Sequence, residues 1–119
     1  YATNEGAVVS NIDDSSVAAG GIVGAITKAA PLTGCQNKAS VTSAANAGGI
    51  VGSTTVATEI NACGNTGDIV RLATATVPAA WFGGIAGQAP SAVLTNCTFG
   101  GTVLGAPGDN NNATGTAAR

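Results

Sequence analysis

The side chains best suited to chemistry in this sequence are three cysteines and six carboxylates. Structural zinc sites are four-coordinate and tetrahedral, whereas three equivalent cysteines of a repeat lack that arrangement and the sequence contains no histidine to join them. The same absence removes the commonest general base and the Ser-His-Asp and Cys-His arrangements. The carboxylates share no repeated spacing and form no convincing acid–base pair. We therefore expect no enzymatic activity, no metal and no cofactor.

The cysteines belong to an internal repeat. A glycine-rich block precedes each cysteine at a nearly constant distance, and a block of the form C-x-N-x-G-x-V follows, with departures at single positions. The glycine-rich blocks are Gly20–Gly24, Gly48–Gly52 and Gly83–Gly87, and the cysteines are Cys35, Cys63 and Cys97. A further half-copy lies at residues 4–8. Two different motifs in a fixed order, three times over, indicate tandem structural repeats.

The repeat predicts an all-β fold. Its short apolar segments are separated by Gly, Asn and Thr and lack a 3.6-residue period, which favours short strands joined by tight corners. We expect a β-solenoid of stacked short-strand repeats of about 28–35 residues. We divide the chain into a solenoid domain and a C-terminal segment that is a tail or a connection between subunits. The solenoid domain is 1–104, with a half-copy at 1–17 and copies at about 18–45, 46–80 and 81–104, and the C-terminal segment is 105–119.

Stacking the copies predicts ladders of equivalent side chains. The apolar ladder comprises Ile22, Ile50 and Ile85, next to glycines that supply either positive φ or close backbone approach. The cysteine ladder comprises Cys35, Cys63 and Cys97, interpreted as small buried thiols, although one disulfide between neighbours stays open. An amide ladder comprises Asn37 and Asn65, which we expect to satisfy buried corner carbonyls.

The last copy is preceded by an insertion of about seven residues, in which Trp81 and Phe82 lie. Insertions in repeat proteins form loops on one face, and aromatic residues concentrate burial energy at interfaces. These two residues are therefore candidates for a contact surface. The alternative is that they fill the local core.

The composition restricts the partners of the chain. Only 8% of residues are charged and the formal net charge is −2, so no basic field attracts nucleic acid. No apolar run is long enough to span a membrane. A surface with so few charges produces little electrostatic repulsion between copies of the chain, which favours a homopolymer.

Asp13-Asp14 and Asp109–Asn112 could supply oxygen ligands to Ca²⁺, but solvated turns are the simpler interpretation.

The alternation of G-G-I-V-G with C-x-N-x-G-x-V resembles the GLUG-type repeats of bacterial surface proteins and secreted adhesins, including non-catalytic regions of some immunoglobulin-A peptidases. The resemblance covers residues 1 to about 104. It implies a β-solenoid displayed outside the cell and implies no proteolysis. The sequence departs from the pattern at two positions. Phe99 occupies the position of Asn37 and Asn65, and Ala39 occupies the position of Gly67.

Two functions follow from different classes. The first is an extracellular structural protein, either a self-assembling filament subunit or a module of an adhesin stalk. The second is a binding module for a glycan or for ice, using a flat solenoid face or the segment around Trp81. Ice binding requires a T-x-T at the same place in every repeat, and Thr74-x-Thr76 occurs only once.

Overall fold

A computed structural model describes residues 1–77, 80–105 and 110–112 of the chain. Within this part the chain is all-β, with strands of two to four residues and no helix. The prediction of an all-β chain of short stacked strands is thereby confirmed. The strands are β1 (Thr3–Asn4), β2 (Val8–Val9), β3 (Ala18–Gly20), β4 (Val23–Ile26), β5 (Leu32–Thr33), β6 (Gln36–Asn37), β7 (Val41–Ser43), β8 (Asn46–Gly48), β9 (Val51–Thr54), β10 (Thr58–Asn61), β11 (Gly64–Asn65), β12 (Ile69–Arg71), β13 (Trp81–Gly83), β14 (Ala86–Gln88), β15 (Ala92–Thr95), β16 (Thr98–Phe99), β17 (Val103–Leu104) and β18 (Asn110–Asn112).

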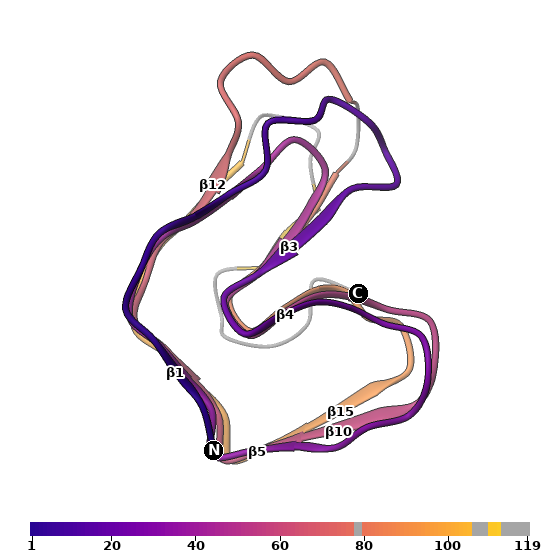
Figure 1. Cartoon of the computed structure of the whole chain (residues 1–119), viewed down its shortest axis with the longest axis vertical. Helices are drawn as coiled ribbons and strands as arrows, with labels where there is room; N and C mark the ends of the chain where they lie inside the picture. Colours follow the sequence, from indigo (N-terminus) through magenta and orange to yellow (C-terminus); the bar gives the residue numbers. More distant parts are fainter. Residues whose placement is uncertain (78–79, 106–109, 113–119) are drawn as a thin grey trace.

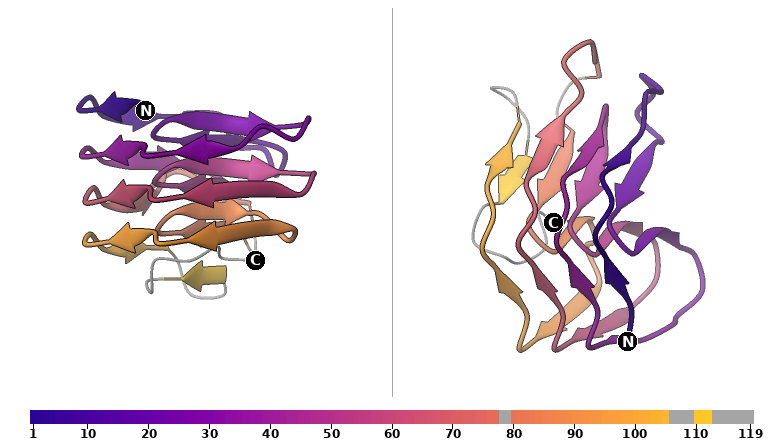
Figure 2. Two further views of the ribbon diagram at one scale, coloured as in Figure 1. Left: turned by 90° about the horizontal axis from the view of Figure 1, so that it is seen from below. Right: turned by 60° about the vertical axis from the view of Figure 1, so that its left-hand side comes forward.

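The strands form five parallel sheets, and the chain returns to the same sheet at every fifth strand. We name them sheet A (β1, β6, β11, β16), sheet B (β2, β7, β12, β17), sheet C (β3, β8, β13, β18), sheet D (β4, β9, β14) and sheet E (β5, β10, β15). One circuit through the five sheets is a layer, so layer 1 is β1–β5, layer 2 is β6–β10, layer 3 is β11–β15 and layer 4 is β16–β18. Figure 1 shows the layers superposed and Figure 2 shows them side by side.

The layers differ in length mainly at the link between sheets B and C; between sheets D and E, layer 3 is one residue shorter than layer 2. In layer 2 this link is only Ala44 and Ala45, both buried. In layer 1 it spans residues 10–17, and in layer 3 it spans residues 72–80. The strands on both sides of the link keep their register, because Val8 pairs with Val41 and Ala18 pairs with Asn46. The link therefore takes up most of the length difference between the repeats without disturbing the sheets.

The glycine-rich block makes the chain fold back on itself between sheets C and D. In Figure 1, β3 runs inward and β4 runs outward again. The two backbones are so close that a Cβ at Gly20 would lie 2.0 Å from Val23 O, and one at Gly52 would lie 2.7 Å from Ala19 N. No glycine of these blocks has a left-handed φ. Of the two roles expected for these glycines, the structure uses close backbone approach.

This fold-back divides the interior into two cores. The first core lies between sheets D and E and the start of sheet A, and its buried members include Ile26, Ile50, Val51, Ile60, Cys63 and Ile85. The second core lies between sheets B and C, and its buried members include Val41, Ala47, Ile69 and Phe82. The side chains are small because each core is narrow, which accounts for the low aromatic content of 3%.

Two segments differ from the sequence-based expectation. Trp81 and Phe82 lie in strand β13 and not in the inserted loop, which ends at Ala80. The stacking also continues past residue 104, because β18 pairs in register with β13. The remainder of the C-terminal segment lies outside the described residues.

Candidate functional site

A ladder of asparagines runs through the stack where the fold-back meets sheet A. Asn4 Nδ2 donates to Asn37 Oδ1 at 2.8 Å, and Asn37 Nδ2 donates to Asn65 Oδ1 at 2.8 Å. Asn37 and Asn65 are each 1% exposed. Each also bonds its own corner, since Asn37 Nδ2 donates to Ala39 O at 2.8 Å and Asn65 Nδ2 donates to Gly67 O at 3.1 Å. The ladder thus satisfies corner carbonyls and links three layers.

The second glycine of each block packs against this ladder. A Cβ at Gly21 would lie 2.4 Å from Asn37 Cγ, and one at Gly49 would lie 2.1 Å from Asn65 Nδ2. The ladder ends in layer 4, where Phe99 pairs with Asn65 in the backbone register. Asn65 Nδ2 donates instead to Gly84 O at 2.8 Å. The corner of the last layer is therefore kept although its amide is replaced by a ring, which lies over Gly84.

The other two expected ladders face the first core. Ile50 and Ile85 are fully buried there, whereas Ile22, in the end layer, is only partly buried. The three cysteines are free thiols, and each donates to a backbone carbonyl of the preceding corner or layer. Burial raises the pKa of the Cys63 thiol, which keeps it in its unreactive protonated form.

The residue before each cysteine has a left-handed backbone conformation. The φ angles are 67° at Gly34, 54° at Ala62 and 53° at Asn96. These three residues occupy equivalent positions at the corner between sheets E and A. Glycine and asparagine adopt this conformation readily, whereas alanine does so at a cost of about 1–2 kcal/mol. Ala62 is therefore a strained position within an otherwise regular corner.

The long links of layers 1 and 3 are joined across the short link of layer 2. Asp13 Oδ1 accepts from Thr76 N at 2.8 Å and from Val77 N at 3.2 Å, and Asp13 Oδ2 accepts from Thr76 Oγ1 at 2.6 Å. Arg71 Nη2 donates to Val77 O. We call the set of contacts between Asp13 and residues 76 and 77 the clasp. It ties together two layers that share no strand pairing.

The clasp also determines the charge of Asp13. The hydroxyl and amide of Thr76 donate to its carboxylate, which lowers its pKa below the ordinary value. The neighbouring Asp14 has a lowered pKa because the amide and hydroxyl of Ser16 donate to it, in a local turn. Both aspartates are thus engaged in hydrogen bonds. Across the described residues, no cluster of His, Cys, Asp or Glu is arranged to hold a metal ion.

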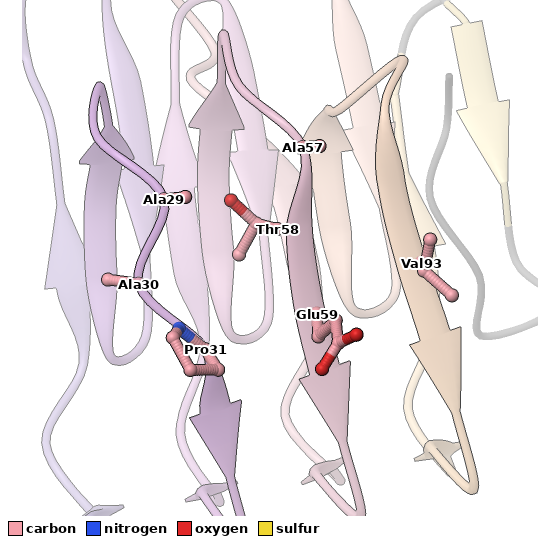
Figure 3. A pocket seen from close by; sticks show the side chains of 7 residues that line it. All are labelled: Ala29, Ala30, Pro31, Ala57, Thr58, Glu59 and Val93. Atoms are coloured by element: carbon pink, nitrogen blue, oxygen red, sulfur yellow. The ribbon is translucent and has the colours of Figure 1, made fainter.

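Among the hollows on the surface of the described part, one lies at sheet E and another lies at sheets C and D. The first, of about 330 Å³, lies on the outer side of sheet E and is lined by Ala29, Ala30, Pro31, Ala57, Thr58, Glu59 and Val93 (Figure 3). It exists because Pro31 has no N–H to donate, so β5 begins only at Leu32 while β10 begins at Thr58. The segment before Pro31 leaves the stack and uncovers the strand beneath.

The second hollow, of about 190 Å³, lies where sheets C and D splay apart. Its lining residues are Ser15, Ala45, Asn46, Val77, Ala80, Trp81 and Gln88. Trp81 is half-buried here, whereas its neighbour Phe82 is fully buried in the second core. Phe82 thus fills the local core, which is one of the two alternatives for this pair, because alternate residues of a strand point to opposite faces.

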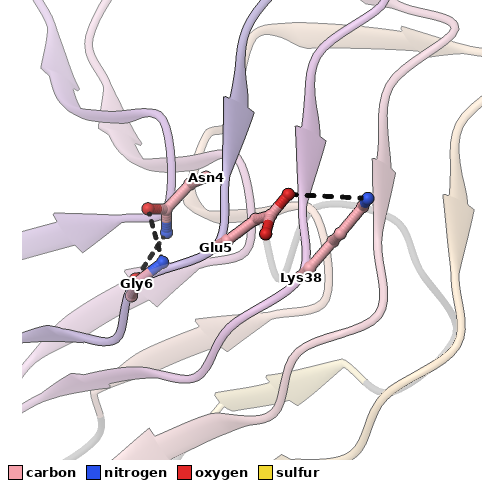
Figure 4. Close-up of polar contacts among 4 residues, drawn as sticks. All are labelled: Asn4, Glu5, Gly6 and Lys38. Atoms are coloured by element: carbon pink, nitrogen blue, oxygen red, sulfur yellow. Dashed lines mark hydrogen bonds and ion pairs between the residues drawn. The ribbon is translucent and has the colours of Figure 1, made fainter.

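Charged side chains are sparse on this surface. One ion pair is present in the described part of the chain, between Lys38 Nζ and Glu5 Oε1 at 3.9 Å, and both side chains are exposed (Figure 4). Beside it, Asn4 exchanges two hydrogen bonds with the backbone of Gly6. Such an exposed pair contributes at most about 1 kcal/mol, so stability depends on backbone ladders and buried amides.

Comparison with known proteins found no matching family model, no matching curated protein and no matching solved structure. Among the described residues there is no helix, and so none of the length and hydropathy needed to cross a membrane.

Sequence reasoning missed two members of these arrangements. Asn4 begins the amide ladder, and its position in the N-terminal half-copy matches that of Asn37, so aligning the half-copy would have found it. Asp13 lies in a link that is longer than its equivalent in layer 2. Counting residues between Val8 and Gly20 against those between Val41 and Gly48 would have revealed that longer link.

Proposed function

We propose that this chain is a β-solenoid that acts as a non-catalytic structural module outside the cell. In this proposal it stacks with other copies into a filament or forms part of an adhesin stalk. The observation that carries the proposal is that, in the described part, all five parallel sheets end in a strand paired on one side only. Unpaired edges of this kind are templates for pairing with another chain.

Sheets A, B and C are the most suitable for such contacts. Each extends over all four layers, whereas sheets D and E have three strands. The edge of sheet E is further blunted by Pro31, which directly precedes β5 and has no N–H to donate. The low charge of the chain leaves little electrostatic repulsion between stacked copies. We therefore expect end-to-end contact through sheets A, B and C.

Strand β2 offers a specific test at the edge of sheet B. Val8 N and Ser10 N donate to Ser40 O and Thr42 O of layer 2 at 3.0 and 2.9 Å. Because N–H groups alternate in direction along a strand, the N–H of Val9 points away from layer 2. Its side chain is 55% exposed. Proline at this position removes a donor on the free edge and no hydrogen bond within the chain.

We expect the wild-type protein to form long particles in negative-stain electron microscopy and large species in sedimentation velocity. Val9→Pro should abolish both, while Val9→Ala, which keeps the N–H, should retain them. Circular dichroism of both variants verifies that the sheets are intact. Monomers of wild-type protein at high concentration would refute self-assembly, and particles unaffected by Val9→Pro would refute contact through the edge of sheet B.

A further inference from the structure

The hollow between sheets C and D combines an aromatic ring with polar side chains. Trp81 and Asn46 occupy equivalent positions in neighbouring layers of sheet C, because Phe82 pairs with Ala47. Gln88 faces them from the end of β14 in sheet D. Ser15 and Val77 belong to the two long links that border the hollow. Two sheets and two links thus converge on one small space.

The chemistry of the lining favours a neutral, hydroxyl-rich ligand. An indole ring offers an apolar face for C–H groups, while amide and hydroxyl side chains both donate and accept hydrogen bonds. None of the described residues that line the hollow is charged. Its volume of about 190 Å³ is below the roughly 300–1,000 Å³ typical of sites for drug-sized ligands. We propose that this hollow binds a single neutral sugar ring.

The walls of the site are held in place before any ligand binds. Asn46 is only 4% exposed, and its Nδ2 donates to Ser15 O at 3.4 Å and to Val17 O at 3.2 Å. The clasp fixes Val77 through the hydrogen bond from its amide to Asp13. Preorganised walls reduce the entropy that binding costs. The inference concerns a single chain and is independent of self-association.

Trp81 provides its own reporter, because it is the only tryptophan in the chain. Glucose, galactose, mannose and N-acetylglucosamine are titrated separately into the protein up to high millimolar concentration, with glycerol as a solvent control. At least one sugar should change the tryptophan fluorescence saturably, and glycerol should not. Glucuronic acid, which carries a charge, should bind more weakly than glucose.

Gln88→Ala tests the assignment of the site, since Gln88 is exposed and its loss leaves the cores intact. Loss of one hydrogen bond should weaken sugar binding by about two- to tenfold. Gln36→Ala, the same change at an exposed position in sheet A, is the matched control and should bind like wild type. The proposal is overturned if no sugar gives a saturable change, or if Gln88→Ala binds as tightly as Gln36→Ala.

Discussion

Replacing the central asparagine of the amide ladder should destabilise the protein far more than replacing the terminal one. Asn37→Ala removes the hydrogen bonds that its side chain makes with Asn4, Ala39 and Asn65, each 2.8 Å long. At about 0.5–1.5 kcal/mol for each bond, the free energy of unfolding should fall by about 3 kcal/mol. Asn4→Ala breaks one bond of the ladder and two exposed bonds with the backbone of Gly6. Because water can replace the exposed bonds, this change should cost only about 1 kcal/mol.

Urea unfolding followed by circular dichroism and Trp81 fluorescence gives both free energies. Asn37→Asp is an informative third variant, because it keeps the shape and the acceptor but loses both donated bonds. At pH 7 its carboxylate would face Asn65 Oδ1, so we expect it to be no more stable than Asn37→Ala. Two results would refute the view that the amide ladder stabilises the stack: equal losses of unfolding free energy for Asn37→Ala and Asn4→Ala, or a loss below about 1 kcal/mol for Asn37→Ala.

Three further predictions concern single residues. Ala62→Gly should raise the free energy of unfolding by up to about 1 kcal/mol, because Ala62 is exposed with a φ of 54°; an unchanged urea midpoint would contradict the strain at this corner. Ellman's reagent should modify the partly buried Cys97 first, whereas Cys35 and Cys63, 3% and 1% exposed, should react only on unfolding; equal rates would rule out the buried ladder. The pKa of Asp13 is lowered in the folded protein, so the stabilisation from its carboxylate should be present above the pKa of the unfolded chain and should disappear as pH falls through the folded pKa. Asp13→Asn should therefore have a lower free energy of unfolding than wild type at pH 7 and approach the wild-type value in acid. A difference that stays constant with pH would show that the charge of the carboxylate does not contribute.

The sequence was sufficient to predict the stacked strands and their register. Asn37, Asn65 and the cysteines recur at fixed spacing, and stacking of equivalent positions follows directly from that recurrence. The buried state of Ile50 and Ile85 follows equally well, since an apolar residue flanked by glycines has no other partner than the neighbouring layers.

The fold-back between sheets C and D could not be read from the same pattern. Gly48 and Gly52 indicate that another group approaches the backbone closely. They do not indicate that this group is the opposite arm of the fold-back, in the same layer for Gly48 and in the neighbouring layer for Gly52. The clasp was equally inaccessible, because Asp13 and Thr76 are unrelated in the repeat and meet only through the length of two links. Trp81 and Phe82 were misplaced because the insertion was read as ending after them, whereas β13 already includes both.

The clasp also depends on the number of layers that lie between the two long links. Asp13 reaches Thr76 across one short layer, and neighbouring layers are about 4.8 Å apart. Duplicating the layer between them would separate the two residues by a further layer spacing, beyond the reach of any hydrogen bond. The sheets would accept such a duplication without a change of register, so the count of short layers between the two long links is fixed by the links alone.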